Sequence, residues 1–478
     1  MLFNSVEFAV FLPIVFILYW ILPHKCRWFL LLVSSYYFYM SWNAKYVVFI
    51  LFTTVVSYIA ARLLERFENK IKKKLIIVGT ALMCLGILFF FKYFNFMSTS
   101  VVRFLNLFAI KLNPVTVNLL LPVGISFYTF QTLSYVIDVY RGTTKAEHHF
   151  GRYATFISFF PQLVAGPIER TNNLLSQIKE EKKFDYAQGS YGIKLMVWGF
   201  FKKIVIADNL SLYVSRIYNA PGEYSGFVFV LATIFFAFQI YCDFSGYSDI
   251  AIGTSKLLGI NLMTNFKSPY FSQSIKEFWG RWHISLSTWF RDYVYIPLGG
   301  NRVGKVRYAL NLLITFLMSG LWHGASWTFV IWGTIHGIAQ IIENLFLPNK
   351  YKNSTGLVRF IRILFVFLFS CFTWIFFVSN SLSDSLFVIM NMFDNISNFG
   401  TYINKGIVDI GITMSNLCGL LFGILVLMLY DGFSLKTDCI EWISNKHVVI
   451  RYTAYLLMLC VLLFYRATVQ AEFVYFQF

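Results

Sequence analysis

The sequence predicts an all-α, polytopic membrane protein with roughly ten to twelve transmembrane helices. Hydrophobic residues make up 58% of the 478-residue chain and charged residues only 13%, whereas soluble domains are about a quarter charged. Apolar stretches long enough to cross a bilayer as helices also recur along the whole chain. They lie near residues 1–22, 44–61, 75–97, 115–137, 192–213, 226–242, 308–347 (two spans), 357–379, 410–431 and 452–470.

Some stretches are too short or too polar to cross. The apolar runs 27–40, 153–168 and 247–260 are expected to be half-spans or re-entrant segments. The second run overlaps FPQLVAGPIER (160–170), whose two prolines bracket a glycine and predict a broken helix. The stretch 278–295 mixes aromatic with charged residues, which is typical of an interfacial or partly inserted helix.

The charge distribution predicts how the chain is oriented. Forty Lys and Arg against 23 Asp and Glu give a net charge of +17, which in a soluble protein would suggest nucleic-acid binding. In a membrane protein the positive-inside rule explains it, and no nucleic-acid partner is expected. Placing the basic clusters 25–27, 62–74 and 302–307 in the cytoplasm directs the C-terminus to the extracytoplasmic side. The first apolar run lacks a basic leader and a cleavage site, so it is expected to remain as a helix.

One domain covering 1–478 is expected, because no linker, low-complexity tract or internal repeat interrupts the chain. The region from about 120 to 340 differs from the rest, since Gly, Pro, Asp, Arg and Trp punctuate its apolar sequence. Irregular backbone at membrane depth is tolerated only beside protein or a water-filled cavity, so the chemistry is expected there. The seven cysteines are scattered and no His, Cys and Asp residues have metal-ligand spacing, so no metal site is expected.

His323 is the first candidate for catalysis. It lies in SGLWHGASW (319–327), inside an apolar stretch where an imidazole is costly to bury without a partner or a task. A helix beginning near Arg307 would place it at most about 24 Å along that helix. Gly320 and Gly324 would allow a substrate to approach closely. We expect His323 to act as a general base on a hydroxyl; the alternative is a hydrogen-bonded histidine of a helix bundle.

Further polar groups stand in apolar surroundings. His283 is flanked by Trp282 and Ile284, in a segment that could alternatively be a plain membrane-surface anchor. For Asp243 and Asp249, pairing with an arginine or with backbone N–H groups is favoured over direct catalysis. A proton relay in a transporter is an alternative of another class, but the inverted repeats of many transporters are not visible in the sequence.

Four motifs in this region together resemble the membrane-bound O-acyltransferase (MBOAT) family, and within it the bacterial alginate O-acetyltransferase-like branch. They are FPQLVAGPIER, FQIYCDFSGYSDIAIG, FWGRWHISLSTWFRDYVYIPLGGNR and GLWHGASWTFVIWGTIHG. The resemblance covers most of the chain and implies helices around a central tunnel in the bacterial cytoplasmic membrane. It places the family's essential histidine at His323 and its second histidine at His283. Structural or tunnel-lining roles are expected for Asp243, Asp249 and Trp322.

The resemblance implies acyl transfer from a cytoplasmic thioester, for which acetyl-CoA is the expected donor substrate; no permanently bound cofactor is expected. The phosphates of CoA need cations at the cytoplasmic mouth. The local candidates are Arg281, Arg291, Arg302, Lys305 and Arg307. Positive-inside anchoring is the alternative explanation for each of them.

The C-terminal hexapeptide FVYFQF (473–478) resembles the F-x-Y-x-x-F motif that ends related cell-envelope acylation proteins. The resemblance implies that Tyr475 carries the acyl group as an ester and passes it to an extracytoplasmic SGNH-hydrolase-like acetyltransferase, which modifies an envelope or exported polysaccharide. A phenol is a weak nucleophile and needs a base, for which His323 is the candidate. Interfacial aromatic anchoring is one alternative, and D-alanyl transfer to teichoic acid from a carrier-protein thioester is another.

Overall fold

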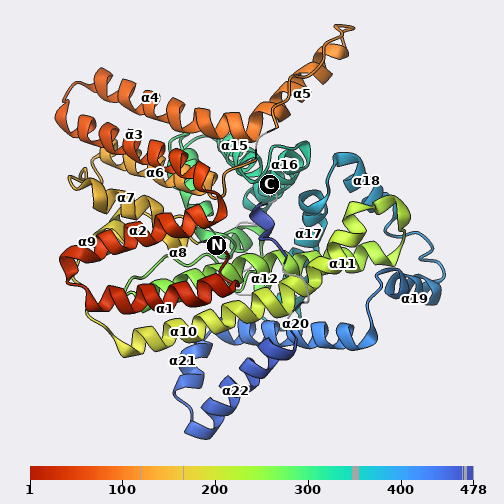
Figure 1. Cartoon of the computed structure of the whole chain (residues 1–478). Helices are drawn as coiled ribbons and strands as arrows, with labels where there is room; N and C mark the ends of the chain where they lie inside the picture. The colour runs from red at the N-terminus through yellow and green to blue at the C-terminus, as the bar shows by residue number, and fades with distance from the viewer. Residues whose placement is uncertain (119, 165, 347–354, 466, 468–470, 477–478) are drawn as a thin grey trace. The chain divides into compact units, whose positions relative to one another are not determined.

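The computed structural model describes every residue except 119, 165, 347–354, 466, 468–470 and 477–478. Every regular element within these described ranges is helical (Figure 1). In the described part of the chain, six helical stretches are long and apolar enough to cross a membrane: His24–Arg66, Lys70–Asn106, Phe227–Leu257, Trp327–Phe346, Gly356–Val378 and Met414–Ser434. The all-α, multi-pass fold expected from the sequence is confirmed.

The chain divides into two compact units. The first holds residues 1–193 and 250–263, and the second holds 194–249 and 264–478. Both boundaries between the units fall inside a helix, one in α10 and one in α12. Compactness alone does not decide the number of domains, and the expectation of one domain stays a prediction.

The first unit contains α1 to α9 and the start of α10. Its helices are α1 (Val6–Ile21), α2 (His24–Asn43), η1 (Ala44–Tyr46), α3 (Val47–Arg66), α4 (Lys70–Leu88), η2 (Phe89–Tyr93), α5 (Phe94–Asn106), α6 (Ile125–Arg141), α7 (Phe150–Ser158), α8 (Phe160–Leu163), α9 (Thr171–Lys179) and α10 (Tyr186–Phe200). The stretch formed by α2, η1 and α3 is 43 residues long, about twice what one crossing needs. It bends at η1, so that α2 and α3 pack on each other and both on α7.

The second unit contains the rest of α10 and the helices that follow. They are η3 (Phe201–Ala207), α11 (Asp208–Asn219), η4 (Pro221–Glu223), α12 (Phe227–Leu257, shared with the first unit), η5 (Pro269–Phe271), α13 (Ile275–Arg281), α14 (Ile284–Phe290), η6 (Arg291–Tyr295), α15 (Lys305–His323), α16 (Trp327–Phe346), α17 (Gly356–Val378), α18 (Leu382–Asn391), α19 (Phe399–Asp409), α20 (Met414–Ser434), α21 (Cys439–Ser444), α22 (Val448–Phe464) and η7 (Val474–Phe476). The predicted pair of helices within 308–347 is α15 and α16, which pack against each other.

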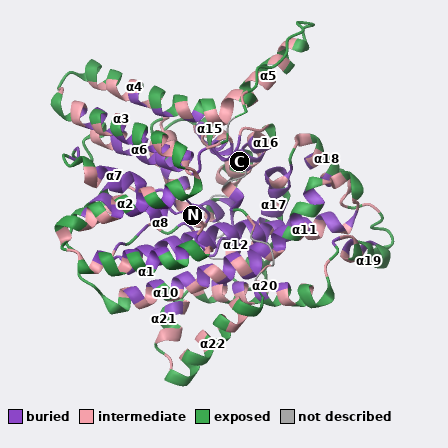
Figure 2. Cartoon of the chain, in the orientation of Figure 1, coloured by how far each residue is buried: buried purple, intermediate pink, exposed green. Residues whose placement is uncertain are grey.

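Several predicted apolar runs have other boundaries in the structure. The run 27–40 is part of a full 20-residue helix, α2, in which the Ser35 hydroxyl donates to the Leu31 carbonyl at 2.6 Å. The expected span 115–137 becomes helical only at Ile125, since prolines precede it and Gly124 is left-handed with φ 74°. The run 247–260 is mostly the C-terminal part of the 31-residue α12 rather than a separate half-span. Figure 2 shows that α12 is buried along most of its length.

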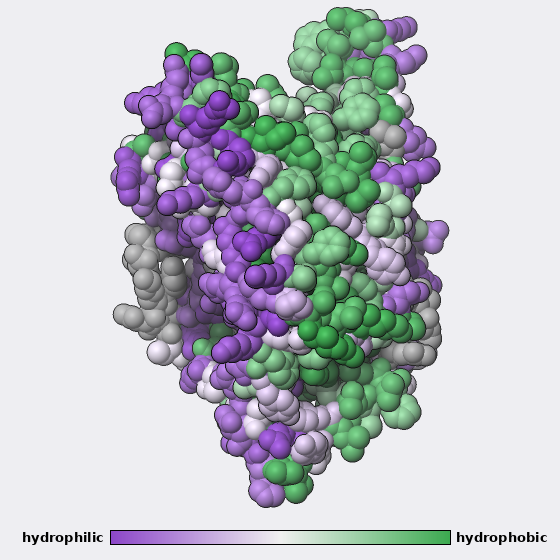
Figure 3. Space-filling view, turned by 60° about the vertical axis from the view of Figure 1, so that its left-hand side comes forward, coloured by the Kyte–Doolittle hydropathy of each residue, from purple (hydrophilic) through white to green (hydrophobic). Residues whose placement is uncertain are grey.

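Apolar side chains also lie on the surface, as expected for a protein surrounded by lipid. On α20, Leu421, Leu425 and Leu429 are exposed at a spacing of four residues and therefore form one apolar face. Figure 3 shows hydrophobic side chains gathered over a broad area beside hydrophilic ones. A water-soluble protein would not leave such an area uncovered.

Candidate active site

The second unit brings together three residues that lie far apart in the sequence. His323 ends α15, His283 immediately precedes α14, and Tyr475 lies in η7. The centroids of the His323 and Tyr475 rings are 5.5 Å apart, those of His283 and Tyr475 6.2 Å, and those of the two imidazoles 6.5 Å. The three residues predicted to be catalytic therefore form one cluster.

The backbone at His283 is unusual. Its φ of 43° and ψ of 54° are left-handed, a conformation that costs a non-glycine residue about 1–3 kcal/mol and is concentrated at functional sites. The break is held in place by Asn265, whose carbonyl accepts from the Ile284 N–H at 2.9 Å and whose side chain accepts from the Ser285 hydroxyl at 2.6 Å. The prediction of one interfacial helix over 278–295 is wrong, because this break separates α13 from α14.

Both histidines are buried among aromatic rings. Burial lowers the pKa of His283 to about 3, so its imidazole is neutral at physiological pH. Phe244 lies edge-on to His283, with ring centroids 4.6 Å apart. The Trp322 ring packs against both imidazoles, and its centroid lies 5.8 Å from that of His283 and 4.9 Å from that of His323. A neutral imidazole has one N–H donor and one acceptor nitrogen, so each histidine can serve as a base or as a hydrogen-bond donor.

The hydroxyl of Tyr475 is buried. Its side chain is half-buried, yet its oxygen is inaccessible and has no hydrogen-bond partner among the described residues. Burial raises the pKa of this phenol above its ordinary value, so a base is required to make it nucleophilic. Its ring packs on Phe244, with centroids 4.6 Å apart.

The glycines beside His323 have a different role from the one predicted. A Cβ atom at Gly320 would collide with the Phe329 carbonyl oxygen, and one at Gly324 would collide with the Phe329 ring. Phe329 on α16 therefore fills the space that was expected to admit a substrate. The glycines instead let α15, which ends at His323, approach α16 closely.

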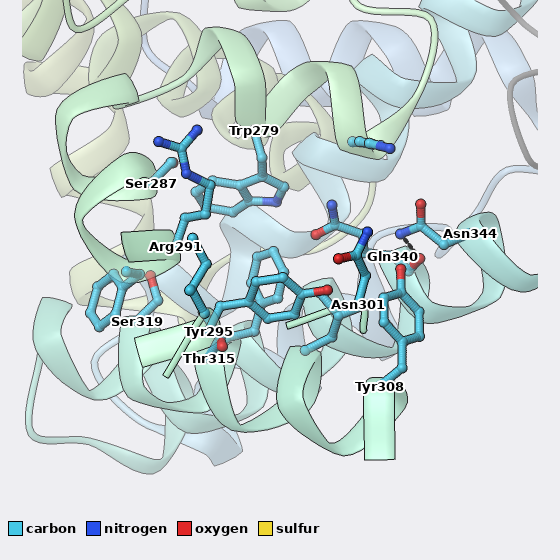
Figure 4. Close-up of a pocket in the computed structure, with 15 residues that line it drawn as sticks. Trp279, Ser287, Arg291, Tyr295, Asn301, Tyr308, Thr315, Ser319, Gln340 and Asn344 are labelled. Atoms are coloured by element: carbon cyan, nitrogen blue, oxygen red, sulfur yellow. Dashed lines mark hydrogen bonds between the residues drawn. The ribbon is translucent and has the colours of Figure 1, made fainter. Parts of the chain in front are cut away.

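Residues of α14 and α15, the two helices that adjoin the histidines, line a cavity of about 450 Å³ (Figure 4). Ser287, four residues after His283, and Ser319, four residues before His323, both line it, and one turn of helix rises about 5.4 Å. Trp279 forms part of the wall. The lining also includes several amides and hydroxyls, from Asn301, Tyr308, Thr315, Gln340 and Asn344.

Of the five cations proposed for CoA phosphates, Arg291 lines this cavity, together with Lys276, which the sequence pattern did not single out. Arg281 is ion-paired with Glu277 at 2.6 Å. The other three are exposed around the start of α15 and do not line the cavity: Arg302, Lys305 and Arg307. The structure thus brings one of the five predicted cations to the cavity.

The two acids on α12, the buried Asp243 and the partly exposed Asp249, are both ion-paired. Lys203 lies 2.6 Å from Asp243, and Lys202 lies 2.6 Å from Asp249. The partners are lysines where an arginine was expected, although the expected backbone partner is also present, since the Val474 N–H donates to Asp243 at 2.7 Å. Two adjacent lysines inside the apolar run 192–213 were the overlooked signal, because buried ammonium groups require acidic partners.

The chain is similar to one known protein family and to several individual proteins. Residues 145–383, which include both histidines, match the model of MBOAT, the membrane-bound O-acyltransferase family. The chain is 37% identical to a probable alginate O-acetylase AlgI of Pseudomonas aeruginosa, over 89% of this chain and 80% of that protein. It is 32% identical to a peptidoglycan O-acetyltransferase of Helicobacter pylori, over 100% of this chain and 98% of that protein. A teichoic acid D-alanyltransferase of Streptococcus thermophilus is 32% identical over 52% of this chain and 63% of that protein.

Proposed function

Because the chain belongs to the membrane-bound O-acyltransferase family, we propose that it moves an acetyl group from cytoplasmic acetyl-CoA toward a cell-envelope or exported polysaccharide, in the bacterial cytoplasmic membrane. The relatives named for O-acetylation of alginate and peptidoglycan align with 89% and 100% of the chain, whereas the D-alanyltransferase aligns with 52%. The observation that carries the proposal is the contact of the Tyr475 ring with both histidines.

In the proposed transfer, His323 accepts the proton of the Tyr475 hydroxyl. The phenolic oxygen attacks the carbonyl carbon of the thioester, the new C–O bond forms, and the C–S bond breaks. The departing CoA thiolate takes the proton from the His323 imidazolium, which returns the base to its neutral form. His283, neutral because of its burial, donates its N–H to the carbonyl oxygen as negative charge develops there.

The cavity beside the histidines is the proposed donor site. Its volume of about 450 Å³ is within the range of small-molecule pockets. Lys276 and Arg291 supply cations for phosphates, and the amides and hydroxyls of the wall match the amide-rich pantetheine arm. Ser287 and Ser319 mark the end of the cavity at which the thioester would meet the histidines.

The acetyl group then leaves Tyr475 for a sugar hydroxyl, with a separate extracytoplasmic SGNH-hydrolase-like acetyltransferase as the proposed partner. A phenol has a pKa of about 10, far below that of a sugar hydroxyl, so its ester is the more reactive one. Transfer from tyrosine to sugar is therefore energetically downhill and needs no further activation.

The test is label transfer from radiolabelled acetyl-CoA to the purified protein, with the C-terminal peptide followed by mass. We expect acetyl on Tyr475 in the parent and none in His323→Ala. Tyr270→Phe is the matched tyrosine control and should label normally. Acetate released in a His323-dependent way, without label on Tyr475, would refute the tyrosine step. Labelling only from a D-alanyl carrier-protein thioester would replace the donor, and no consumption of either donor would overturn the proposal.

A further inference from the structure

We propose that Asp243, held by Lys203, is a positioning residue that fixes the C-terminal segment 471–475, so that Tyr475 faces the two histidines. The catalytic consequence rests on the proposed function, whereas the fixing of the segment does not. Both residues belong to a buried charge cluster that the acyl-transfer step itself does not use.

The cluster is built around one ammonium group. Lys203 Nζ lies 2.8 Å from Asp208 Oδ1 and 2.6 Å from Asp243 Oδ1, and all three side chains are at most 2% exposed. The same nitrogen donates to the Ala471 carbonyl at 3.1 Å. An ammonium group has three N–H donors, so one of the three is used on the backbone of the C-terminal segment.

Asp243 makes the second backbone contact. Its Oδ2 accepts from the Val474 N–H at 2.7 Å, while its Oδ1 faces Lys203. A hydrogen bond to an ionised carboxylate is about twice as strong as a neutral one. The carboxylate therefore joins the lysine to the peptide group between Phe473 and Val474, one residue before Tyr475. The neighbouring Phe473 is fully buried and packs on Tyr247, with ring centroids 4.7 Å apart.

The adjacent ion pair shows that this contact is specific. Lys202 and Asp249 come from the same two elements, η3 and α12, and pair at the same 2.6 Å. Lys202 also donates to the hydroxyl of Ser245, another residue of α12, at 2.9 Å. Within the described residues it is the Lys203 and Asp243 pair that contacts the C-terminal backbone. Buried ion pairs are weak contributors to stability compared with apolar packing, so stability alone does not explain this contact.

Hydrogen exchange in the full-length protein tests the fixing of the segment. In Asp243→Asn and Lys203→Met, the backbone amides of 471–475 should exchange at least about tenfold faster. That factor corresponds to the loss of one strong hydrogen bond. The matched variants Asp249→Asn and Lys202→Met should leave exchange in this segment unchanged. Equal acceleration in both pairs would indicate general loosening and overturn the proposal, as would unchanged exchange in all four.

Kinetics with acetyl-CoA test the positioning role. Asp243→Asn should lower kcat for acetylation of Tyr475 while the donor KM stays at the parent value, because the donor cavity is intact. A raised KM with an unchanged kcat would contradict positioning. If the parent protein never labels Tyr475, the proposed function fails, and the exchange measurement still decides whether Asp243 and Lys203 hold the segment.

Discussion

Replacing Tyr475 by phenylalanine should abolish polysaccharide acetylation without destabilising the protein. The hydroxyl is buried and makes no hydrogen bond within the described part of the chain. A buried polar group without a partner costs about 1–3 kcal/mol. Since the Tyr475 side chain is only half-buried, we take the lower end and expect Tyr475→Phe to be more stable by about 1 kcal/mol. The ring contacts are preserved, because phenylalanine has the same ring.

Tyr270→Phe is the control, because it removes a hydroxyl that is hydrogen-bonded. Tyr270 donates to the Ala237 carbonyl at 2.5 Å, and losing that bond should cost about 1–2 kcal/mol. The two variants should therefore change stability in opposite directions while only Tyr475→Phe loses acetylation. Thermal unfolding in detergent, followed by tryptophan fluorescence, and polymer acetylation in cells measure the two effects.

Two results would refute this reasoning. If Tyr475→Phe lowered stability as much as Tyr270→Phe, the hydroxyl would have a structural partner rather than being held ready for acylation. If Tyr475→Phe kept normal acetylation at a normal protein level, the tyrosine could not carry the acyl group.

Three further predictions concern the groups around this centre. His283 has a folded pKa of about 3 against about 6.5 when unfolded, so its stabilising contribution is complete above about pH 6.5 and is lost as the pH falls. The melting temperature of His283→Gln should therefore decline less than that of the parent between about pH 7 and about pH 5, and an equal decline would contradict neutral burial. Arg291→Glu should raise the acetyl-CoA KM about fivefold, as expected for an exposed charge contact. Arg302→Glu is the control and should leave that KM at the parent value. If steady-state kinetics gave the same KM for both variants, Arg291 would not belong to the donor site. Gly320→Ala should lower the melting temperature, because its Cβ would collide with Phe329, and an unchanged temperature would show that α15 and α16 can separate without cost.

The general fold could be predicted from the sequence because a membrane-spanning helix is recognisable from the apolar composition of its own residues. A run of about 20 apolar residues is a helix whatever its partners are. Predictions failed where distant partners decide the structure. The runs 226–242 and 247–260 were predicted as separate segments, yet both lie largely in α12, where Asp243 is paired with Lys203, 40 residues away.

For the same reason, the sequence predicted some residues of the site but not the contacts between distant segments that position them. The two histidines and Tyr475 could be found from motifs, but the link from Asp243 to Val474 spans 231 residues and no local pattern records it. The glycines beside His323 illustrate the opposite error. Their spacing was visible, but whether a substrate or Phe329 occupies the space depends on how α16 packs.

The most direct test of the central claim is a rapid-quench time course of a single turnover with radiolabelled acetyl-CoA. If Tyr475 carries the acyl group, label should appear on the C-terminal peptide before any free acetate, and His323→Gln should delay its appearance without changing donor binding. Label that appears first as acetate, or on any other peptide, would contradict the account.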